Sequence, residues 1–279
     1  TVVRDMVPDA QAASMIGYVT MGMALVPMVG PIIGGAIDEA FGWRANFVLL
    51  FILGAIVTAI CWADLGETAR PSKTTLMGQV RQYPVLFKSY RFWGYAITAA
   101  AASGAFFSFL GGAPFVGSEV YGMSPATLGY YFAAPAVGYL IGNFASARLS
   151  VRMGIVRMVL AGGLVLSIAM SVLLVLTLMG IRHQMLFFGM MTAVGIGNGL
   201  TMPNANAGMM SVRPDLAGTA SGLGGAIMVA GGAALAALAG AVLQPGGTEL
   251  PLVAIMFVTS LIALGATVVV IRRNRLLGL

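Results

Sequence analysis

Residues 156–179 read VRMVLAGGLVLSIAMSVLLVLTLM, and Arg157 is the only charged side chain in this run. A helix needs about 20 mostly apolar residues to cross the hydrocarbon core of a bilayer. The run is long enough for that, and its side chains lack the two-residue alternation of a strand in a membrane barrel. We therefore predict a transmembrane helix over 156–179.

Other apolar runs of similar length lie along the chain. Together with the first they predict eight spans, over 11–36, 45–63, 93–115, 127–146, 156–179, 185–203, 217–243 and 251–271. Only 9% of the 279 residues are charged, whereas a soluble domain carries about 25% charged residues. This composition excludes a soluble enzyme and a disordered chain, and it indicates an all-α membrane protein.

The basic residues test this map, because cytoplasmic connections carry an excess of Lys and Arg. When the connections are assigned alternately to the two sides, 13 of the 15 basic residues fall on one side and only Arg44 and Arg182 on the other. We predict that the first side is cytoplasmic and that both ends of this chain lie there. The positive charge then reflects topology in the lipid bilayer, and no nucleic-acid partner is expected.

The residue pattern does not indicate enzymatic chemistry. The single histidine, His183, lies in a predicted outer connection, and Ser221 has no base in the pattern around it. The single cysteine, Cys61, excludes an internal disulfide or a cysteine cluster. We predict that the protein is not an enzyme and has no catalytic residues, metal or cofactor. A membrane-embedded enzyme stays a distant alternative.

A short repeat suggests two related halves. Pro8-Asp9 precedes the first predicted span and Pro214-Asp215 precedes the seventh, and both spans are rich in small residues. Two parallel halves are an architecture of secondary transporters. A purely structural membrane subunit would not need such a repeat.

The repeat also predicts how the chain is divided. Residues 93–279 would form a C-terminal bundle of six helices, and residues 1–68 would supply the last two helices of an N-terminal bundle. Residues 69–92 would be a cytoplasmic linker. The chain would thus hold eight of an expected twelve helices, with four more preceding Thr1.

Proline and glycine interrupt the apolar run at the end of the first predicted span, at Gly30-Pro31 and Gly34-Gly35. Proline removes a backbone donor from a helix, and glycines let another helix approach closely. We predict a hinge or a tight seal at the outer end of this span. The alternative is a packing face without a gating role.

This stretch resembles the antiporter motif of drug:proton exporters in the major facilitator superfamily. The matching residues are Gly17, Gly30, Pro31, Gly34 and Gly35. Val26 replaces the second glycine of the motif. Other stretches are similar to the Bcr/CflA multidrug efflux branch, among them Arg4-Asp5, Phe41-Gly42-Trp43-Arg44, Pro203-Asn204 and Ala217-Gly218-Thr219-Ala220-Ser221.

The resemblance implies the major facilitator fold and a function. The protein would be a monomer in a bacterial inner membrane that exports a lipophilic small molecule in exchange for protons, by alternating access and with the proton gradient as its energy source. An uptake carrier, or an exporter of a metabolite such as a sugar, amino acid or nucleobase, is the alternative within the same fold.

Polar, aromatic and methionine side chains near mid-span are the candidates for substrate contacts. The corresponding helices line the central cavity in the superfamily, and aromatic and methionine surfaces suit varied lipophilic ligands. The candidates are Tyr18, Met21, Phe106, Phe107, Tyr131, Tyr139, Asn198 and Met228. Asn198 is the strongest of them, because a buried amide needs hydrogen-bond partners.

Two further expectations concern gating and coupling. Arg152 and Arg157 resemble the weaker copy of the superfamily's cytoplasmic gating motif, with Val151 where an acidic residue is expected. They would latch the cytoplasmic gate or simply anchor the topology. No carboxylate falls at mid-depth of a predicted span, so the proton-coupling acid is expected in helices that precede this chain.

Overall fold

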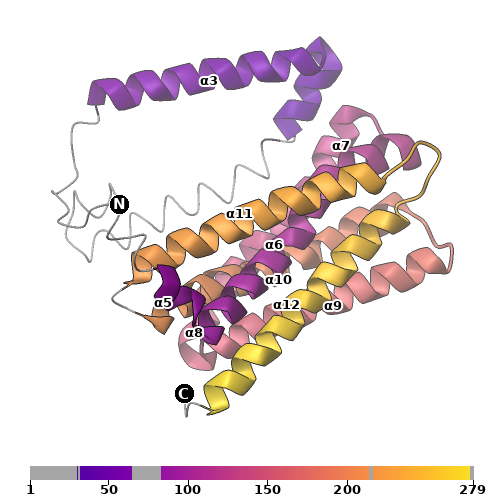
Figure 1. Ribbon diagram of the computed structural model, residues 1–279. Helices are drawn as coiled ribbons and strands as arrows, with labels where there is room; N and C mark the ends of the chain where they lie inside the picture. Colours follow the sequence, from indigo (N-terminus) through magenta and orange to yellow (C-terminus); the bar gives the residue numbers. More distant parts are fainter. Residues whose placement is uncertain (1–29, 31, 65–82, 214–215, 277–279) are drawn as a thin grey trace.

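The computed structural model describes residue 30 and residues 32–64, 83–213 and 216–276. These residues form helices joined by short turns and loops, with no strand among them (Figure 1). A helix over 32–41 is followed by α3 (Trp43–Asp64), α5 (Tyr83–Phe87), α6 (Tyr90–Phe115), the π-helical turn η1 (Val116–Val120), α7 (Pro125–Tyr131), α8 (Ala133–Met153), α9 (Ile155–Leu178), α10 (Gln184–Val212), α11 (Ala217–Val242) and α12 (Leu250–Leu276).

Six of the described helical segments are long and apolar enough to cross a membrane. They are α3, α6 with η1, α9, α10, α11 and α12, and each coincides with a predicted span. The all-α fold expected from the sequence is therefore confirmed. The predicted span over 11–36 falls almost entirely outside the described residues, as does most of the predicted linker over 69–92.

The predicted span over 127–146 is two helices, α7 and α8, which meet at Phe132. A helix running through this point would need an amide hydrogen on Pro135 to bond the carbonyl four residues earlier, and proline has none. Pro135 instead lies in the first turn of α8, where the missing donor costs little. α8 also carries Arg148 and Arg152, and it is absent from the helices that are apolar enough to span.

Helices α6 to α12 form a bundle with α10 at its centre, packed against α8, α9, α6 and α11. α6 in turn packs between α11 and α12. In contrast, most of α3 lies apart from the bundle, and none of its side chains is buried against the described residues (Figure 1).

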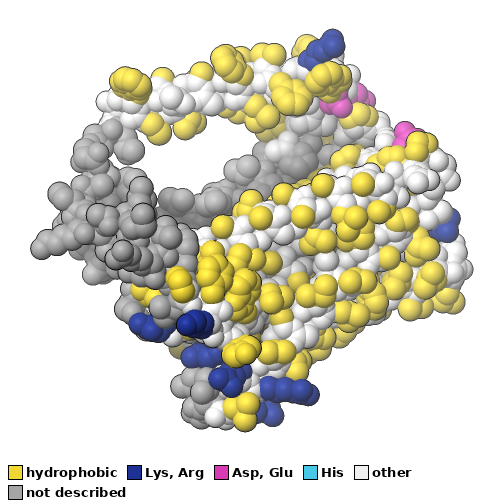
Figure 2. All heavy atoms as spheres, in the orientation of Figure 1, with side chains coloured by type: hydrophobic (Ala, Val, Ile, Leu, Met, Phe, Trp, Pro, Cys, Tyr) yellow, Lys and Arg dark blue, Asp and Glu magenta, His cyan; other side chains and the backbone are white. Residues whose placement is uncertain are grey.

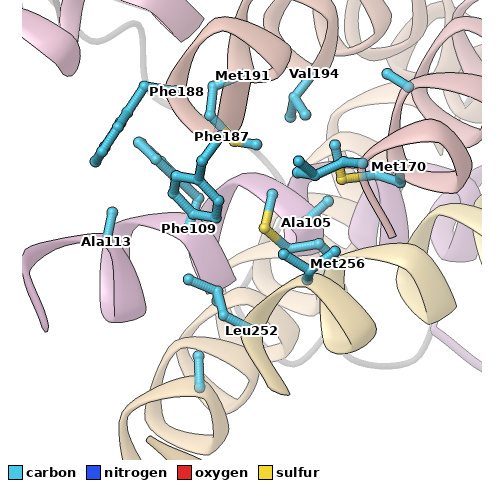
Figure 3. Packing of buried hydrophobic residues seen from close by; sticks show 14 of the residues in the cluster. Ala105, Phe109, Ala113, Met170, Phe187, Phe188, Met191, Val194, Leu252 and Met256 are labelled. Atoms are coloured by element: carbon cyan, nitrogen blue, oxygen red, sulfur yellow. The ribbon is translucent and has the colours of Figure 1, made fainter. Parts of the chain in front are cut away.

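Two hydrophobic clusters fill the bundle. The aromatic cluster is built around Phe109 of α6 and Phe187 and Phe188 of α10, with Leu252 and Met256 from α12 beside them (Figure 3). The ring of Phe187 meets that of Phe188 edge to face, with centroids 5.0 Å apart. The second cluster lies toward the other end of the bundle and includes Leu86, Phe92, Tyr95 and Met209.

Glycines bring α8 and α10 into backbone contact. Gly138 and Gly142 on α8, and Gly195 and Gly199 on α10, both follow the four-residue spacing of close helix pairs. A Cβ atom at Gly199 would lie 2.6 Å from the carbonyl oxygen of Tyr139, so a larger residue would force the helices apart. Since lipid tails are as apolar as leucine, such close van der Waals packing is what drives association here.

Hydrogen bonds between side chains tie the bundle together. The hydroxyl oxygens of Thr98 on α6 and Thr267 on α12 are 3.3 Å apart. Asn204 of α10 donates from Nδ2 to the hydroxyl oxygen of Ser146 on α8, at 2.7 Å. Bonds of this kind contribute about 0.6 kcal/mol on average within a membrane, and they set which helix faces meet.

Candidate functional site

The glycines at 34 and 35 lie where the helix over 32–41 crosses the start of α7. A Cβ atom at Gly35 would lie 2.5 Å from the carbonyl oxygen of Pro125 and 3.2 Å from the Cα atom of Ala126. The two backbones are therefore in contact, and glycine alone fits between them. We call this contact between Gly34-Gly35 and Pro125-Ala126 the glycine seam.

The seam is held by a side chain that no motif in the sequence singles out. Asn46, in the first turn of α3, donates from Nδ2 to the carbonyl oxygen of Gly34, at 3.1 Å. Asn46 reaches Gly34 because the chain turns sharply at Gly42, whose φ of +78° suits glycine. The Phe41-Gly42-Trp43-Arg44 stretch thus carries the turn that folds α3 back toward the seam.

A cleft of about 240 Å³ opens beside the seam, between the helix over 32–41, the start of α3, α7 and Phe132. Its lining combines small, apolar and polar residues: Gly34, Gly35, Asp38, Asn46, Pro125, Leu128, Gly129 and Phe132. Asp38 is half-buried there and forms no ion pair with another described residue. The cleft can therefore accept a small polar group next to the seam.

The other motif residues differ in what the structure says of them. No described atom lies within 4 Å of a Cβ atom built at Gly30, so none of the described residues packs against that position. Gly17 and Pro31 lie outside the described residues. Of the five matched residues, the structure thus brings Gly34 and Gly35 together with a second helix.

Two substrate candidates join the aromatic cluster. The ring of Phe106 stacks on Phe109 with centroids 6.3 Å apart, and the ring of Tyr131 lies 5.1 Å from that of Phe188. Both side chains are half-buried. Figure 3 shows the rings of Phe109, Phe187 and Phe188 that they meet. Their aromatic surfaces are therefore used in large part for packing between α6, α7 and α10.

The remaining described candidates lie on separate helix faces. Phe107 packs its ring on Gly232 of α11, while Met228 lies half-buried one turn earlier on the same helix. Tyr139 of α8 is half-buried, and its backbone lies against Gly195 of α10. Tyr18 and Met21 are outside the described residues. The role of all these residues in substrate binding stays a prediction.

Asn198 lies inside the bundle. Its side chain is 5% exposed, and it follows Met191 and Val194 along the buried row of α10. Its Oδ1 atom has no hydrogen-bond partner among the described residues, and neither has the hydroxyl of Thr201 less than one turn further on. Asn198 is therefore buried as expected, but among helix contacts of the bundle, and substrate contact through it stays a prediction.

The two arginines expected at a gate lie on either side of a sharp turn. Gly154, with a φ of +82°, separates the end of α8 from the start of α9. Arg152 and Arg157 are both exposed there and form no ion pair with a described residue. Their gating role stays a prediction.

A buried carboxylate lies at the opposite end of the bundle. Glu249, just before α12, is 1% exposed, and its Oε1 atom is 3.6 Å from Nε of Arg182 in the connection between α9 and α10. Burial raises the pKa of the nearby Tyr121, and the negative charge of Glu249 raises it further, against a smaller lowering by Arg182. The pattern of the sequence placed Glu249 in a connection, without a sign that it is buried.

Comparisons with known proteins agree with this fold. The chain is 27% identical over 241 residues to a bicyclomycin resistance protein homolog of Haemophilus influenzae, covering 84% of this chain and 60% of that protein. It is 28% identical over 273 residues to a chloramphenicol resistance protein of Pseudomonas aeruginosa, covering 96% and 63%. It is also 28% identical over 259 residues to multidrug resistance protein D of Escherichia coli, covering 90% of this chain and 63% of that protein. The chain thus spans less than two thirds of the length of these relatives.

Solved structures and a family model point the same way. A bacterial homologue of the iron transporter ferroportin, in an inward-facing state, superposes with a TM-score of 0.65 at 13% identity, covering 96% of this chain and 65% of that one. A bacterial homologue of the lysosomal transporter Spinster gives 0.61 at 17% identity, covering 98% and 72%. The model described as Major Facilitator Superfamily matches residues 1–237. The chain therefore belongs to the major facilitator superfamily of membrane transporters.

Proposed function

We propose that the protein exports drug-like small molecules across a bacterial inner membrane in exchange for protons, by alternating access. Family membership supports transport, and the relatives named for resistance to bicyclomycin, chloramphenicol and multiple drugs support export of such molecules. In this proposal the protein acts as a monomer, is not an enzyme and needs no cofactor.

The glycine seam is the observation that carries the proposal. The helix over 32–41 belongs to the predicted first half of the transporter, and α7 belongs to the second. Backbone contact at Gly35 and Pro125 joins the two without an intervening side chain. Such a contact would keep the outer side of the transporter closed while the inner side is open, which an exporter requires in order to load substrate without leakage.

Alternating access needs this contact to break and re-form as a unit. The bond from Asn46 to the carbonyl oxygen of Gly34 ties α3 to the helix over 32–41. Both helices would therefore move together when the halves rock. Asp38, in the cleft beside the seam, would be exposed to the external solution when the seam opens.

Proton coupling is proposed to depend on an acid outside the described residues. The described carboxylates are Asp38, Glu39, Asp64, Glu119 and Glu249, and all of them lie near helix ends or in connections. A coupling group has to meet both sides in turn, and an ionisable residue within a span is the usual carrier. The concentration of Lys and Arg at one end of the bundle supports a cytoplasmic location of that end.

The test is export from cells. Expression of the gene in bacteria that lack their own efflux pumps should lower the accumulation of a fluorescent lipophilic cation such as ethidium, and an uncoupler that collapses the proton gradient should restore it. Unchanged ethidium accumulation, together with enhanced uptake of a sugar, amino acid or nucleobase, would favour the uptake carrier, and enhanced release of such a metabolite would favour the metabolite exporter. Export that persists without a proton gradient would refute proton coupling.

A further inference from the structure

Positive side chains gather at one end of the bundle. Eight of them form no ion pair with a described residue: Lys88, Arg91, Arg148, Arg152, Arg157, Arg272, Arg273 and Arg275. Figure 2 shows dark-blue side chains collected at this end, near the last turn of α12. Among the described residues, the one ion pair is between Arg182 and Glu249, and it lies at the opposite end of the bundle. The positive charge of this basic end is therefore not neutralised by the described protein.

Within the basic end, the start of α6 lies beside the end of α12. The two helices run antiparallel, with the hydroxyls of Thr98 and Thr267 3.3 Å apart and Gly94 in contact with Val270. The guanidinium carbon of Arg273 lies 5.5 Å from the centre of the Tyr90 ring. This register brings the first turn of α6, including Arg91, level with the last turn of α12.

Two buried polar atoms at this level lack partners in the described part of the chain. Nε of Arg91 and Oδ1 of Asn274 are each shielded from solvent, and neither forms a hydrogen bond with a described residue. Asn274 is 8% exposed as a residue. Leaving such groups unpaired costs free energy, and the oxygen and nitrogen of an asparagine amide are interchangeable by shape. Asn274 can thus present either end of its amide to a ligand beside Arg91.

The surroundings suit the interfacial region of a bilayer. Tyr90 is 71% exposed, and Trp93 is half-buried, with its indole nitrogen donating to the carbonyl oxygen of Phe87 at 2.9 Å. Tyr and Trp gather at the level of the lipid headgroups. Because α12 is apolar before its last turn and much of its surface is not buried, acyl chains can lie along it below a bound headgroup.

We propose that the phosphate of an anionic phospholipid binds between the start of α6 and the end of α12. Arg91 and Arg273 supply the positive charge, and the amide of Asn274 donates to a phosphate oxygen. Arg272 and Arg275 extend the favourable field. The ligand is a lipid and not a free phosphate, because the site lies at headgroup level beside exposed apolar helix surface. This site is independent of the proposed direction of transport.

The test is lipid binding to the purified chain in detergent micelles, measured by native mass spectrometry during titration with phosphatidylglycerol or phosphatidylcholine. We expect phosphatidylglycerol to bind more tightly. A basic residue at an anionic surface contributes about fivefold in affinity, so the double variant R91Q/R273Q should weaken phosphatidylglycerol binding by about tenfold or more. The matched control R148Q/R152Q removes the same charge from the basic end but from α8, which packs against α9 and α10 and not against α6 or α12, and it should change binding by less than about twofold.

Two further measurements complete the test, one with a variant of Asn274 and one with a soluble competitor. Asn274→Asp changes little in shape but puts a negative charge against the phosphate, so it should reduce phosphatidylglycerol binding even if the double variant folds poorly. Glycerol phosphate, a soluble headgroup, should not compete at millimolar concentration. Equal weakening by the two double variants, equal binding of the two lipids, or full competition by glycerol phosphate would each overturn the proposal.

Discussion

Substitution of Gly35 tests the glycine seam most directly. In Gly35→Ala the new Cβ atom would lie 2.5 Å from the carbonyl oxygen of Pro125, whereas ordinary contacts begin near 3.4 Å. The helix over 32–41 and α7 must therefore separate by about 0.9 Å. Overpacking of this kind costs about 1–3 kcal/mol, and each 1.4 kcal/mol changes an equilibrium about tenfold. The closed seam should lose population by roughly tenfold or more.

Two measurements follow this change. The first is ethidium export by cells expressing the variant, which should fall several-fold while the amount of inserted protein stays constant. The second is thiol cross-linking across the cleft, between Asp38→Cys and Leu128→Cys in a background where Cys61 is replaced by serine, which should become slower. Gly265→Ala, at an open position on α12, is the control and should leave both measurements unchanged.

The comparison with Gly30 sharpens the test. The motif alone gives Gly30 and Gly35 equal weight, but no described atom would meet a side chain at Gly30. As far as contacts with the described residues decide the outcome, Gly30→Ala should therefore be mild where Gly35→Ala is severe. Export and cross-linking of Gly35→Ala at the level of the unmodified protein would refute the reasoning about the seam.

Three other predictions concern the bundle, each read from thermal unfolding in detergent with Gly265→Ala as the control. Gly195→Ala should lower the free energy of unfolding by about 1–3 kcal/mol, because its Cβ atom would meet the backbone of α8; an unchanged midpoint would contradict close packing there. Asn204→Ala and Ser146→Ala should each destabilise, with a coupling energy of about 0.6 kcal/mol in a double-mutant cycle; strict additivity would mean that their hydrogen bond contributes nothing. Burial and Glu249 hold the pKa of Tyr121 above its unfolded value, so the stabilising contribution of the phenol is complete below about pH 10 and is lost as the pH rises through the folded-state pKa. As the pH rises above about 10, the free energy of unfolding should therefore fall less in Tyr121→Phe than in the unmodified protein. Identical dependence of stability on alkaline pH in the two proteins would contradict the burial of Tyr121.

Some of the candidate site was visible in the sequence. The glycines at 34 and 35 drew attention because proline and glycine interrupt an apolar run, and the structure places them in a close helix crossing. Asn46 carried no such signal, since one asparagine near the start of a span looks like any polar residue at a helix end. Its importance comes from the turn at Gly42, which brings it within hydrogen-bonding distance of Gly34.

The sequence by itself determined most of the described membrane helices, although the predicted span over 127–146 is divided into α7 and α8. Apolar composition acts locally, so the runs over 156–179 and 217–243 became α9 and α11 with ends shifted by one residue or not at all. The tertiary structure alone decided which faces meet. It placed Asn198 inside the bundle, buried Glu249 beside Arg182 and set Gly35 against Pro125. A helix that is apolar all round has no amphipathic face to mark its contacts, so these partners follow only from how the helices pack together.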